Sequence, residues 1–588
     1  MVKYKIESVL GGIAPSNYVS GKGQYNSAIS IDPDYPVGSQ VKASGMIVPV
    51  AYEKFSSASI TGAPMWTITN PKNSNVYTYL SDGKFFRYDS ALANETALTT
   101  PTSGAGNGMT YYNNYIYLTT PTNVARYGPM DNSPSLTQTV WSTSTLGSQK
   151  LLTNTTYPTI QGTVLPNHAM FSHTDGALYL CDVSPQGQGI INKIKTSPTL
   201  AYDAQGGNFT VGLTVTGGTS GATGTIVADA DAGATGTLTL SGVLGAFQDN
   251  ETITDTSTGT ATVNGTLVQG AGNDGSAYNV LDLPFGYFPI GISNKGTDLA
   301  IVAMQTTNAD INQGECALFL WNTLDESFYR QITINDPLVT AIYNSNGAVH
   351  IFSGSSKGGL RHLVYNGADG FTELELMEEC YPTSQGAVSA FHERICYGTA
   401  TSYPVVTGSV FARGSRRGEF RSGTHCIAKS TATTSTPYVT SICYAQQSDG
   451  YTKPKMVIGW RDGVGYGLDK YTAASTLSSV WRSQIAVIGQ RFKMLELKLN
   501  LAVAIASTTT ITAKIYTDDD FTTAVKTLPT INNANYSGKK TIQFKVTDLD
   551  VIALDNFMLE LTWSGTVACP VKLPISFKLD LFQDEPTG

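Results

Sequence analysis

The chain has 588 residues, which is long for one hydrophobic core and predicts two to four domains. Charged residues make up only 14% of it, against about 25% in an ordinary soluble domain, so Gly, Ser, Thr and Asn fill much of the surface. The net charge of −8 argues against a general nucleic-acid-binding surface.

The cysteine pattern and the apolar pattern indicate where the protein folds. Seven cysteines are widely scattered without any CxxC pair, so we expect no disulfide framework and folding in a reducing cytoplasm. Residues 1–6 lack the apolar core of a signal peptide. No apolar run approaches the roughly 20 residues that a membrane helix needs. We therefore expect no membrane segment.

Residues 1–44 form an irregular arm rich in Gly, Ser and Asn. Such an arm has little core of its own, and we expect it to lie on a neighbouring surface. Asp32 and Asp34 offer carboxylates that could bind calcium. Two prolines, Pro33 and Pro36, stiffen the segment and no ligand loop follows it, so a polar turn is favoured over a metal site.

The hairpin of residues 75–89 supplies the pattern that recurs through the chain. Val76–Leu80 is β-branched or aromatic, a turn at Ser81–Gly83 follows, and Phe85–Tyr88 runs back as a second strand. A degenerate hairpin repeated every few tens of residues indicates radial β repetition. The further copies are Tyr115–Gly128, Leu178–Ile194, Leu318–Arg330 and Val349–Asn366.

These repeats predict an all-β protein whose main body is a β-propeller of about seven blades, in two parts at residues 45–196 and 273–475. The two ends of a propeller commonly share a blade. We therefore expect the first strand, Ile47–Tyr52, to close the ring against the late strand Met456–Trp460.

Residues 197–272 break this rhythm, because the segment contains no Lys or Arg and is dominated by Gly, Thr, Ala and Val. Gly221–Val227 is repeated as Gly233–Thr239. The segment predicts a small β module inserted into a propeller loop, facing outward and dispensable for folding. Asp229 and Asp231 look like half a calcium loop, but the downstream acid is missing, so a turn is favoured.

The pattern changes again at about residue 476. Long alternating segments predict a C-terminal antiparallel β-sandwich at residues 476–588. Asp518–Asp520 falls between two of them and is interpreted as a solvated acidic turn rather than a cation site. The expected strands are 492–501, 508–516, 540–546, 557–563 and 571–581.

One motif resembles a catalytic nucleophile. Gly354–Gly358 matches G-x-S-x-G, with Ser356 in the nucleophile position. That elbow needs a strand before it and a helix after it, whereas Leu360–Tyr365 predicts another strand. We therefore interpret the match as a hairpin loop.

The histidines form no pattern that supports chemistry. His168 and His173 are five residues apart, a weak spacing for a shared metal, and no HExxH is present. His425 and Cys426 are strand neighbours whose side chains point to opposite faces. We expect no catalytic residue, metal or cofactor, and no enzymatic activity.

The sharpest charge feature is a group of four arginines in one loop, Arg413, Arg416, Arg417 and Arg421, with Glu419 among them. In a charge-poor acidic chain, such a group indicates contact with an anion or with a partner protein. A solvated loop is the alternative.

The layout of the arm and the repeats resembles a known family. Gly11–Gly12, Gly23–Tyr25 and Ile31–Pro33 lead into Ser44–Pro49, and repeats of the Arg87–Asp89 kind follow. Residues 1–475 are similar in this respect to bacteriophage tail proteins of the tail-nozzle or tail-tube β-propeller type. The resemblance implies a structural protein of the virion tail, a ring of six copies, contacts with other tail proteins, and DNA passing transiently through a channel.

Two hypotheses about function follow. The first is a structural virion protein that forms a ring for DNA passage or for fibre attachment. The second is a carbohydrate-binding or carbohydrate-active propeller that recognises a host receptor, with tyrosine and tryptophan as stacking platforms. A glycosidase would need two carboxylates facing each other near the propeller axis, and the pair Glu378–Glu379 lies in a loop. Fold alone does not choose between these hypotheses.

Overall fold

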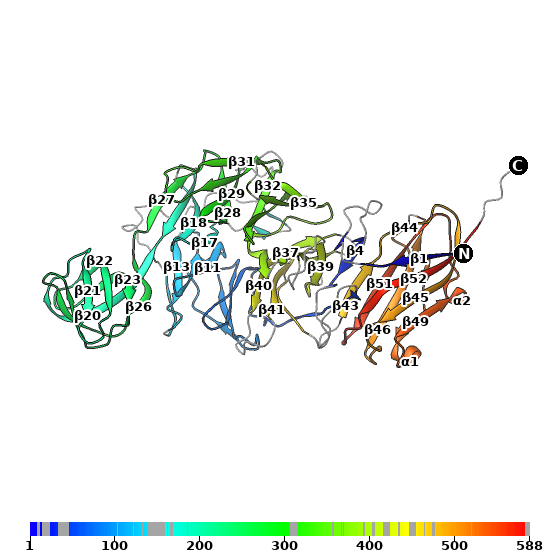
Figure 1. The fold of residues 1–588 in the computed structure, drawn as a ribbon, viewed down its shortest axis with the longest axis horizontal. Helices are drawn as coiled ribbons and strands as arrows, with labels where there is room; N and C mark the ends of the chain where they lie inside the picture. The colour runs from blue at the N-terminus through cyan, green and yellow to red at the C-terminus, as the bar shows by residue number, and fades with distance from the viewer. Residues whose placement is uncertain are drawn as a thin grey trace.

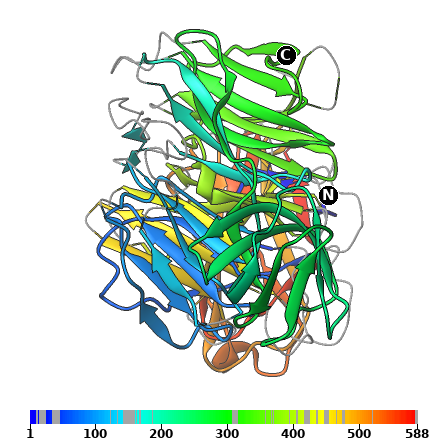
Figure 2. The ribbon, with the colours of Figure 1, turned by 90° about the vertical axis from the view of Figure 1, so that its left-hand side faces the viewer.

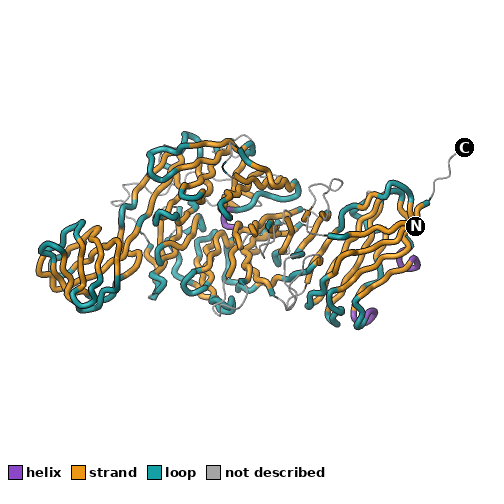
Figure 3. The backbone as a smooth tube through the Cα atoms, viewed as in Figure 1, coloured by secondary structure: helices purple, strands orange, loops and turns teal. Residues whose placement is uncertain are grey.

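The computed structural model is almost entirely β-structure, as the strands of Figure 3 show. Within the part of the chain that it describes, no helix is long and apolar enough to cross a bilayer. The described residues are 1–8, 12–13, 24–32, 46–102, 104–121, 123–131, 133–138, 140, 159–160, 163–164, 168–184, 186–305, 315–355, 358–365, 367, 370–391, 394–402, 406–414, 424–432, 436–445, 454–463, 465–472, 477–518 and 520–582.

The molecule is elongated and consists of three units in a row, with the inserted module at one end, the propeller in the middle and the sandwich at the other end (Figure 1). In Figure 2, which looks along the long axis from the insert, the orange and red sandwich strands lie behind the propeller. Both ends of the described chain belong to the sandwich.

The propeller contains seven four-stranded antiparallel sheets, which confirms the prediction of about seven blades. Blades 1 to 3 are β7 (Pro64–Thr69), β8 (Val76–Leu80), β9 (Phe85–Tyr88) and β10 (Glu95–Ala97); β11 (Gly108–Tyr112), β12 (Tyr115–Thr119), β13 (Val124–Gly128) and β14 (Ser135–Thr137); and β17 (Met170–Ser172), β18 (Leu178–Val183), β19 (Gly189–Ile194) and β27 (Ala277–Asp282). Blades 4 and 5 are β28 (Phe288–Lys295), β29 (Asp298–Met304), β30 (Cys316–Trp321) and β31 (Arg330–Ile334); and β32 (Leu338–Ser345), β33 (Ala348–Ser355), β34 (Gly358–Tyr365) and β35 (Thr372–Met377). Blades 6 and 7 are β36 (Val388–Phe391), β37 (Arg394–Thr401), β38 (Thr407–Arg413) and β39 (Thr424–Lys429); and β40 (Pro437–Ala445), β41 (Lys455–Asp462), β42 (Gly465–Tyr471) and β6 (Tyr52–Lys54).

The second strand of each blade is buried on both faces, because one blade packs against the next. All five residues of β8 and all five of β12 are buried, although Thr78 and Thr119 are polar. Thr78 donates to the backbone oxygen of Trp66, so its hydroxyl is satisfied inside the fold. This packing explains why these strands appear in the sequence as continuous β-branched and aromatic runs rather than as alternating ones.

The seven innermost strands form a closed ring. Each one contacts the innermost strand of the next blade, and β40 of blade 7 contacts β7 of blade 1. The expected closing strand was wrong in detail. Tyr52–Lys54 closes blade 7 by pairing with β42, whereas Met46–Ile47 pairs with β52 of the sandwich. The chain leaves the sandwich at this point, so only the last residue of the expected strand, Tyr52, belongs to the blade strand.

The inserted module is a small barrel between β19 and β27 of blade 3. Ile191 pairs with Leu281 across these two blade strands, so the blade is continuous on either side of the insertion, as the sequence predicted. The barrel closes because β20 pairs with both β23 and β25, and its apolar side chains form a core of their own. Its strands are β20 (Thr196–Gly207), β21 (Thr214–Gly217), β22 (Thr223–Asp231), β23 (Gly236–Leu244), β24 (Thr252–Asp255), β25 (Thr260–Val263) and β26 (Val268–Asn273).

The C-terminal sandwich packs two antiparallel sheets around one core, and its long strands lie where the alternating pattern predicted them. One sheet consists of β1 (Val2–Ile6), β52 (Val571–Leu581), β45 (Phe492–Leu501) and β49 (Thr541–Lys545), with β5 (Met46–Ile47) and β50 (Ile552–Ala553). The other consists of β4 (Ser27–Ile29), β43 (Leu477–Arg482), β51 (Asn556–Gly565), β46 (Thr509–Thr517) and β47 (Lys526–Thr527), with β44 (Ala486–Val487) and β48 (Ile531–Asn532).

The described parts of the N-terminal arm differ from expectation, because they lie on their own chain. β1 pairs along its whole length with β52, and β4 pairs with β43. Each sheet of the sandwich therefore takes a strand from the arm. The remaining short elements are β2 (Gly12–Ile13) paired with β3 (Gln24–Tyr25), β15 (Thr159–Ile160) paired with β16 (Thr163–Val164), the helices α1 (Asn533–Tyr536) and α2 (Val546–Leu549), and the 3-10 turn η1 (Gln385–Ala387).

Candidate functional site

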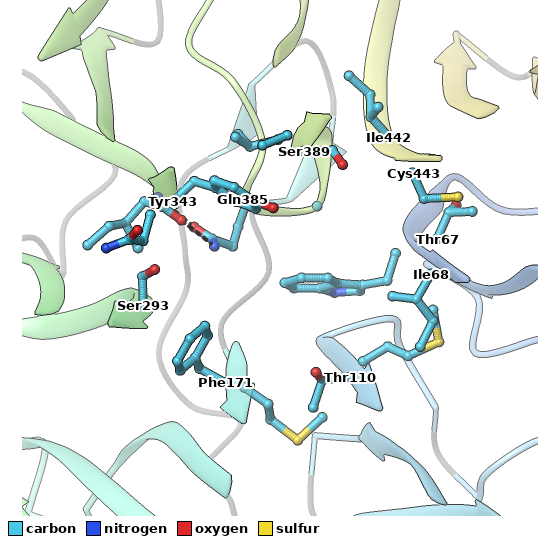
Figure 4. Close-up of a pocket in the computed structure, with 18 of the residues that line it drawn as sticks. Thr67, Ile68, Thr110, Phe171, Ser293, Tyr343, Gln385, Ser389, Ile442 and Cys443 are labelled. Carbon is cyan, nitrogen blue, oxygen red and sulfur yellow. Dashed lines mark hydrogen bonds between the residues drawn. The ribbon is translucent and has the colours of Figure 1, made fainter. Parts of the chain in front are cut away.

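A cavity of about 490 Å³ lies on the propeller axis, where all seven innermost strands contribute to its wall. Figure 4 shows the side chains that surround it. The volume falls within the range of small-molecule pockets in proteins, roughly 300–1,000 Å³. The lining residues are Trp66–Thr69, Met109, Thr110, Met170, Phe171, Ile292–Asn294, Ile342–Asn344, Gln385, Gly386, Val388–Ala390, Ile442–Tyr444 and Pro454.

The turn η1 forms part of the cavity wall. The side chain of Gln385 binds the backbone of Ile342: its Oε1 accepts from the Ile342 N–H at 2.8 Å, and its Nε2 donates to the Ile342 carbonyl at 3.0 Å. Gly386 passes so close to β7 that a Cβ atom would lie 2.0 Å from the Met65 carbonyl oxygen. The turn therefore contacts the innermost strands β7, β32 and β40. We call this cavity the cup.

The cup opens toward the ends of the innermost strands. Trp66, Met109 and Ile342 are buried at its base, whereas Thr69 and Asn344, farther along their strands, are partly exposed. The progression from buried to accessible side chains follows the strand direction in several blades.

Among the described residues, no charged side chain lines the cavity. The thiol of Cys443 is part of this described wall, and burial raises the pKa of that thiol to about 12, so the sulfur is protonated at neutral pH and is a poor nucleophile. A propeller glycosidase would need carboxylates, and none belongs to the described wall; Glu379 accepts a hydrogen bond from Ser402 outside it. The described wall can therefore bind a ligand, but it supplies no acid, base or reactive nucleophile.

A second region concentrates ionisable groups where the arm meets the propeller. Asp32 and Arg394 of β37 form a bidentate ion pair with distances of 3.0 and 3.1 Å, and the two side chains are only 6% and 3% exposed. Close by, the Tyr25 hydroxyl lies 2.8 Å from Nδ1 of His425. We call residues 24–32, together with Arg394 and His425, the seam.

The seam also holds the backbone of the arm. The Ile31 N–H donates to the Cys426 carbonyl of blade 6 at 3.0 Å, while β4 pairs with β43 of the sandwich. The arm therefore joins the propeller to the sandwich. The polar turn expected at Asp32 was wrong, because its carboxylate serves an ion pair to a residue far away in the chain; Asp34 lies outside the described residues.

Of the four arginines in the predicted contact loop, the structure describes only Arg413. Its guanidinium donates to the Thr424 hydroxyl at 3.3 Å and lies 3.9 Å from the Glu375 carboxylate. Arg413 therefore makes its contacts within blade 6 and with the neighbouring blade 5. Arg416, Arg417 and Arg421 lie outside the described residues, in the segment that connects β38 to β39.

A buried polar cluster surrounds Arg413. Nδ1 of His350 lies 2.9 Å from Nε2 of His362, and the His362 ring stacks on Phe352 with centroids 4.5 Å apart. Burial, with a contribution from Arg413, lowers the pKa of His350 to about 4 and that of His362 well below its usual value. Burial also raises the pKa of Glu375. These groups fill the space between blades 5 and 6 and lie outside the axial cavity.

The two spaced histidines do not share a site. Nδ1 of His168 lies 3.1 Å from the Cys181 carbonyl, whereas Nδ1 of His173 lies 3.1 Å from the Asp175 carboxylate. His425 and Cys426 also use different partners, as their positions on the strand predicted: His425 contacts Tyr25, and the Cys426 thiol donates to Ala428. Within the described ranges, no group of three or more His, Cys, Asp or Glu side chains is arranged to hold a metal ion.

The other motifs are local structure. Asp520 accepts from Thr522 and Thr523, so this acidic segment is a turn, as predicted. Asp229 and Asp231 instead lie at the end of strand β22, and the turn begins only after Asp231, which accepts from the Gly233 N–H at 2.7 Å. The G-x-S-x-G match lies between β33 and β34, which pair as a hairpin. The strand-then-helix setting of a nucleophile elbow is therefore not found there; Ser356 itself lies outside the described residues.

Sequence reasoning missed Gln385, Trp66, Tyr25 and Arg394. A single Gln before a strand and a single Arg within a strand carry no local signal for their roles. Trp66 could have been noticed as an aromatic residue shortly before the hairpin of residues 75–89, in the first strand of blade 1. The partner of Arg394 is 362 positions away in the sequence, so no spacing rule could have paired it with Asp32.

No protein-family model matches the chain, and no curated protein matches it. Among solved structures, the computationally designed Ika8 protein is 11% identical with a TM-score of 0.32, and the match covers 70% of this chain and 98% of Ika8. Sqt1 of Saccharomyces cerevisiae is 11% identical with a TM-score of 0.35, covering 72% of this chain and 98% of Sqt1. The β-propeller domain of Myceliophteria thermophila Cps50 (Swd1) is 8% identical with a TM-score of 0.36, covering 72% of this chain and all of that domain. Similarities this weak carry no argument about function.

Proposed function

We propose that the chain is a non-catalytic structural component of a bacteriophage virion, assembled in the host cytoplasm and built into the tail as a ring of identical copies. The observation that carries the proposal is the use of buried ionisable groups. Asp32, Arg394 and His425 join the arm to the propeller, while the described wall of the axial cavity carries no charge. A protein whose work is to hold a shape places its strongest polar contacts between its parts.

The identity as a tail protein rests on the resemblance of residues 1–475 to tail-nozzle and tail-tube propellers. The six-fold ring rests on the same resemblance. The geometry adds one constraint: the axial cavity of about 490 Å³ is far too small for a duplex. In this proposal, DNA passes through a channel between copies rather than through any single propeller.

The arginine loop supplies the proposed contact between copies or with a neighbouring tail protein. Arg413 anchors the start of this loop to Glu375 and Thr424, which leaves Arg416, Arg417 and Arg421 on the connection between β38 and β39. An acidic surface on the next subunit would pair with them. Removing a desolvated partner of this kind typically costs about 2–5 kcal/mol of association free energy.

The test is the double variant Arg416→Glu and Arg417→Glu. It should be absent from assembled particles while the isolated chain keeps the melting temperature of the wild type. The matched control is Lys539→Glu with Lys540→Glu, an adjacent exposed basic pair on the sandwich, which should still assemble. Mass measurement of purified particles gives the copy number. A wild-type chain found only as a free monomer, and absent from any particle, would contradict the proposal.

The alternative of a carbohydrate-active propeller receives no support from the axial wall, because the described part of that wall has no carboxylate. Carbohydrate binding is a separate matter, since recognition needs hydroxyl and aromatic groups rather than an acid pair.

A further inference from the structure

We propose that the axial cup binds an uncharged sugar residue. Such a ligand site would go beyond a purely structural role, and it is independent of whether the chain forms a ring. The proposal rests on three properties of the cup: its unpaired hydroxyl groups, its aromatic side chains and its lack of charge.

Three hydroxyl groups line the cup without a hydrogen-bond partner among the described residues. They belong to Thr110 of β11, Ser293 of β28 and Ser389 of β36, which come from three different blades. Figure 4 shows the three oxygens on different sides of the cavity. Ser293 gives the strongest evidence for a ligand, because this residue is buried, with only 3% of its surface exposed. Buried polar groups are normally hydrogen-bonded, so these hydroxyls are suited to pair with a bound molecule.

Several other polar side chains of the cup are already used by the fold. The Thr67 hydroxyl pairs with that of Ser441 at 2.8 Å, and Thr69 donates to the Tyr444 carbonyl at 2.9 Å. Both groups of the Gln385 amide bind Ile342. The free hydroxyls are therefore a distinct set rather than the general state of the wall.

Aromatic and apolar side chains form the rest of the surface. Trp66 at the base donates its indole N–H to the Gly106 carbonyl at 2.9 Å, which fixes the ring, and Phe171 lies partly exposed nearer the opening. Met109 and Met170 fill the space between blades. An aromatic face with hydroxyl groups beside it matches a pyranose ring, which presents C–H groups on its faces and hydroxyls at its edge.

The lack of charge on the described wall argues against other ligand classes. A carboxylate, phosphate or ammonium group would lose water in the cup without meeting a counter-charge. A purely apolar ligand would leave the three hydroxyls unpaired, which is unfavourable for each of them. A neutral molecule rich in hydroxyl groups satisfies both conditions.

The test is ligand-observed NMR and titration calorimetry on the full chain with neutral hexoses and N-acetylhexosamines. Free monosaccharides and the same sugars at the end of an oligosaccharide form separate arms, which distinguish a free metabolite from a surface glycan. At least one neutral sugar should bind. Its uronic acid and its amino-sugar analogue should bind at least about tenfold more weakly, because each carries an unpaired charge into the cup.

Variants locate the binding. Ser293→Ala and Thr110→Val each remove one hydroxyl at nearly constant volume, and each should weaken binding about fivefold to tenfold. The matched control Ser345→Ala lies on the innermost strand β32 but outside the cup wall, and it should leave binding unchanged. Melting curves establish that each variant is folded.

Three results would overturn the proposal. One is that no neutral sugar binds to the folded chain at millimolar concentration. Another is that charged and neutral analogues bind equally well. The third is that a sugar binds but keeps its affinity in both Ser293→Ala and Thr110→Val, which would place the site elsewhere on the molecule.

Discussion

The axial cup and the seam differ in how far their polar side chains are paired within the chain. Among the described residues, the cup has no charged side chain, and three of its hydroxyls have no partner. In the seam, by contrast, Asp32 and Arg394 satisfy each other with two hydrogen bonds, and Tyr25 pairs with His425. The comparison separates two kinds of polar site: one is completed by the fold itself, and the other has hydrogen-bonding capacity left for a ligand.

The difference also shows the role of a buried ion pair in this protein. A buried ion pair is not in itself evidence of high stability, because desolvation offsets much of the attraction. A buried ion pair does, however, require that its two residues meet, since either partner alone would be a buried uncompensated charge. The Asp32–Arg394 pair therefore gives the arm one place on blade 6, and through the arm it sets how the sandwich sits on the propeller.

The largest expected effect comes from breaking the seam. Asp32→Ala leaves Arg394 buried without its partner and should lower the free energy of unfolding by about 3–5 kcal/mol. Denaturant unfolding followed by tryptophan fluorescence measures it. The control is Asp131→Ala, which breaks an ion pair with Lys72 whose two side chains are 49% and 42% exposed and should cost under about 1 kcal/mol. Equal losses in the two variants would contradict this account of the seam.

A pH change tests the propeller without changing a residue. Burial lowers the pKa of both His168 and His350 to about 4, from an ordinary value of 6.5. Between these values the unfolded chain binds more protons than the folded one. Stability should therefore be full above pH 6.5, fall as the pH drops, and stop falling from this cause near pH 4.

For His168, which is almost fully buried beside Asp182, the loss should be on the order of 3 kcal/mol across that window. Melting temperatures from pH 7 to pH 4 give the slope. His168→Asn, whose amide can still donate to the Cys181 carbonyl, should make the slope shallower. A slope identical to that of the wild type would show that His168 does not titrate in this window.

Deleting the inserted barrel tests a third junction, the one between the barrel and blade 3. Unlike the seam, this junction has no buried ion pair among the described residues. Thr196 and Asn273 face each other across the neck, so an Asn-Gly link can replace residues 197–272. The shortened chain should fold and should lose about 1–2 kcal/mol, because Arg126 no longer donates to the Gly270 and Ala271 carbonyls. Arg126→Ala in the intact chain should lose a similar amount.

The readout for this deletion is circular dichroism together with the melting temperature. An insoluble or unfolded product would show that the barrel is part of the propeller core, and the interpretation of residues 197–272 as a dispensable module would be wrong.

The smallest effect is expected from reductant. All seven cysteines are buried and none forms a disulfide, so neither the cup nor the seam depends on a covalent link. Burial raises the pKa of the Cys426 thiol, next to the seam, to about 11. The melting temperature should be the same with and without reductant, and thiol reagents should react with the folded chain far more slowly than with the denatured one. A clear shift in melting temperature on reduction would contradict this.

The sequence by itself determined the strands and the class of fold. Alternation and hairpin turns are local properties, so the pattern of residues 75–89 predicted β8 and β9, and the long alternating runs predicted β45, β46, β51 and β52. The insertion could also be located from sequence, because the segments that form β19 and β27 have the pattern of one blade interrupted by residues 197–272.

Only the tertiary structure decided which distant residues meet. The ring brings Thr110, Ser293 and Ser389 to one cup, although they lie in blades 2, 4 and 6. The return of the arm brings Asp32 to Arg394, and it was this long-range contact that the local interpretation of Asp32 as a turn got wrong. The physical reason is that the side-chain pattern of a strand specifies its faces but not the partner of each face. That partner is decided when the ring closes and the arm completes the sandwich, by contacts between segments separated by hundreds of residues.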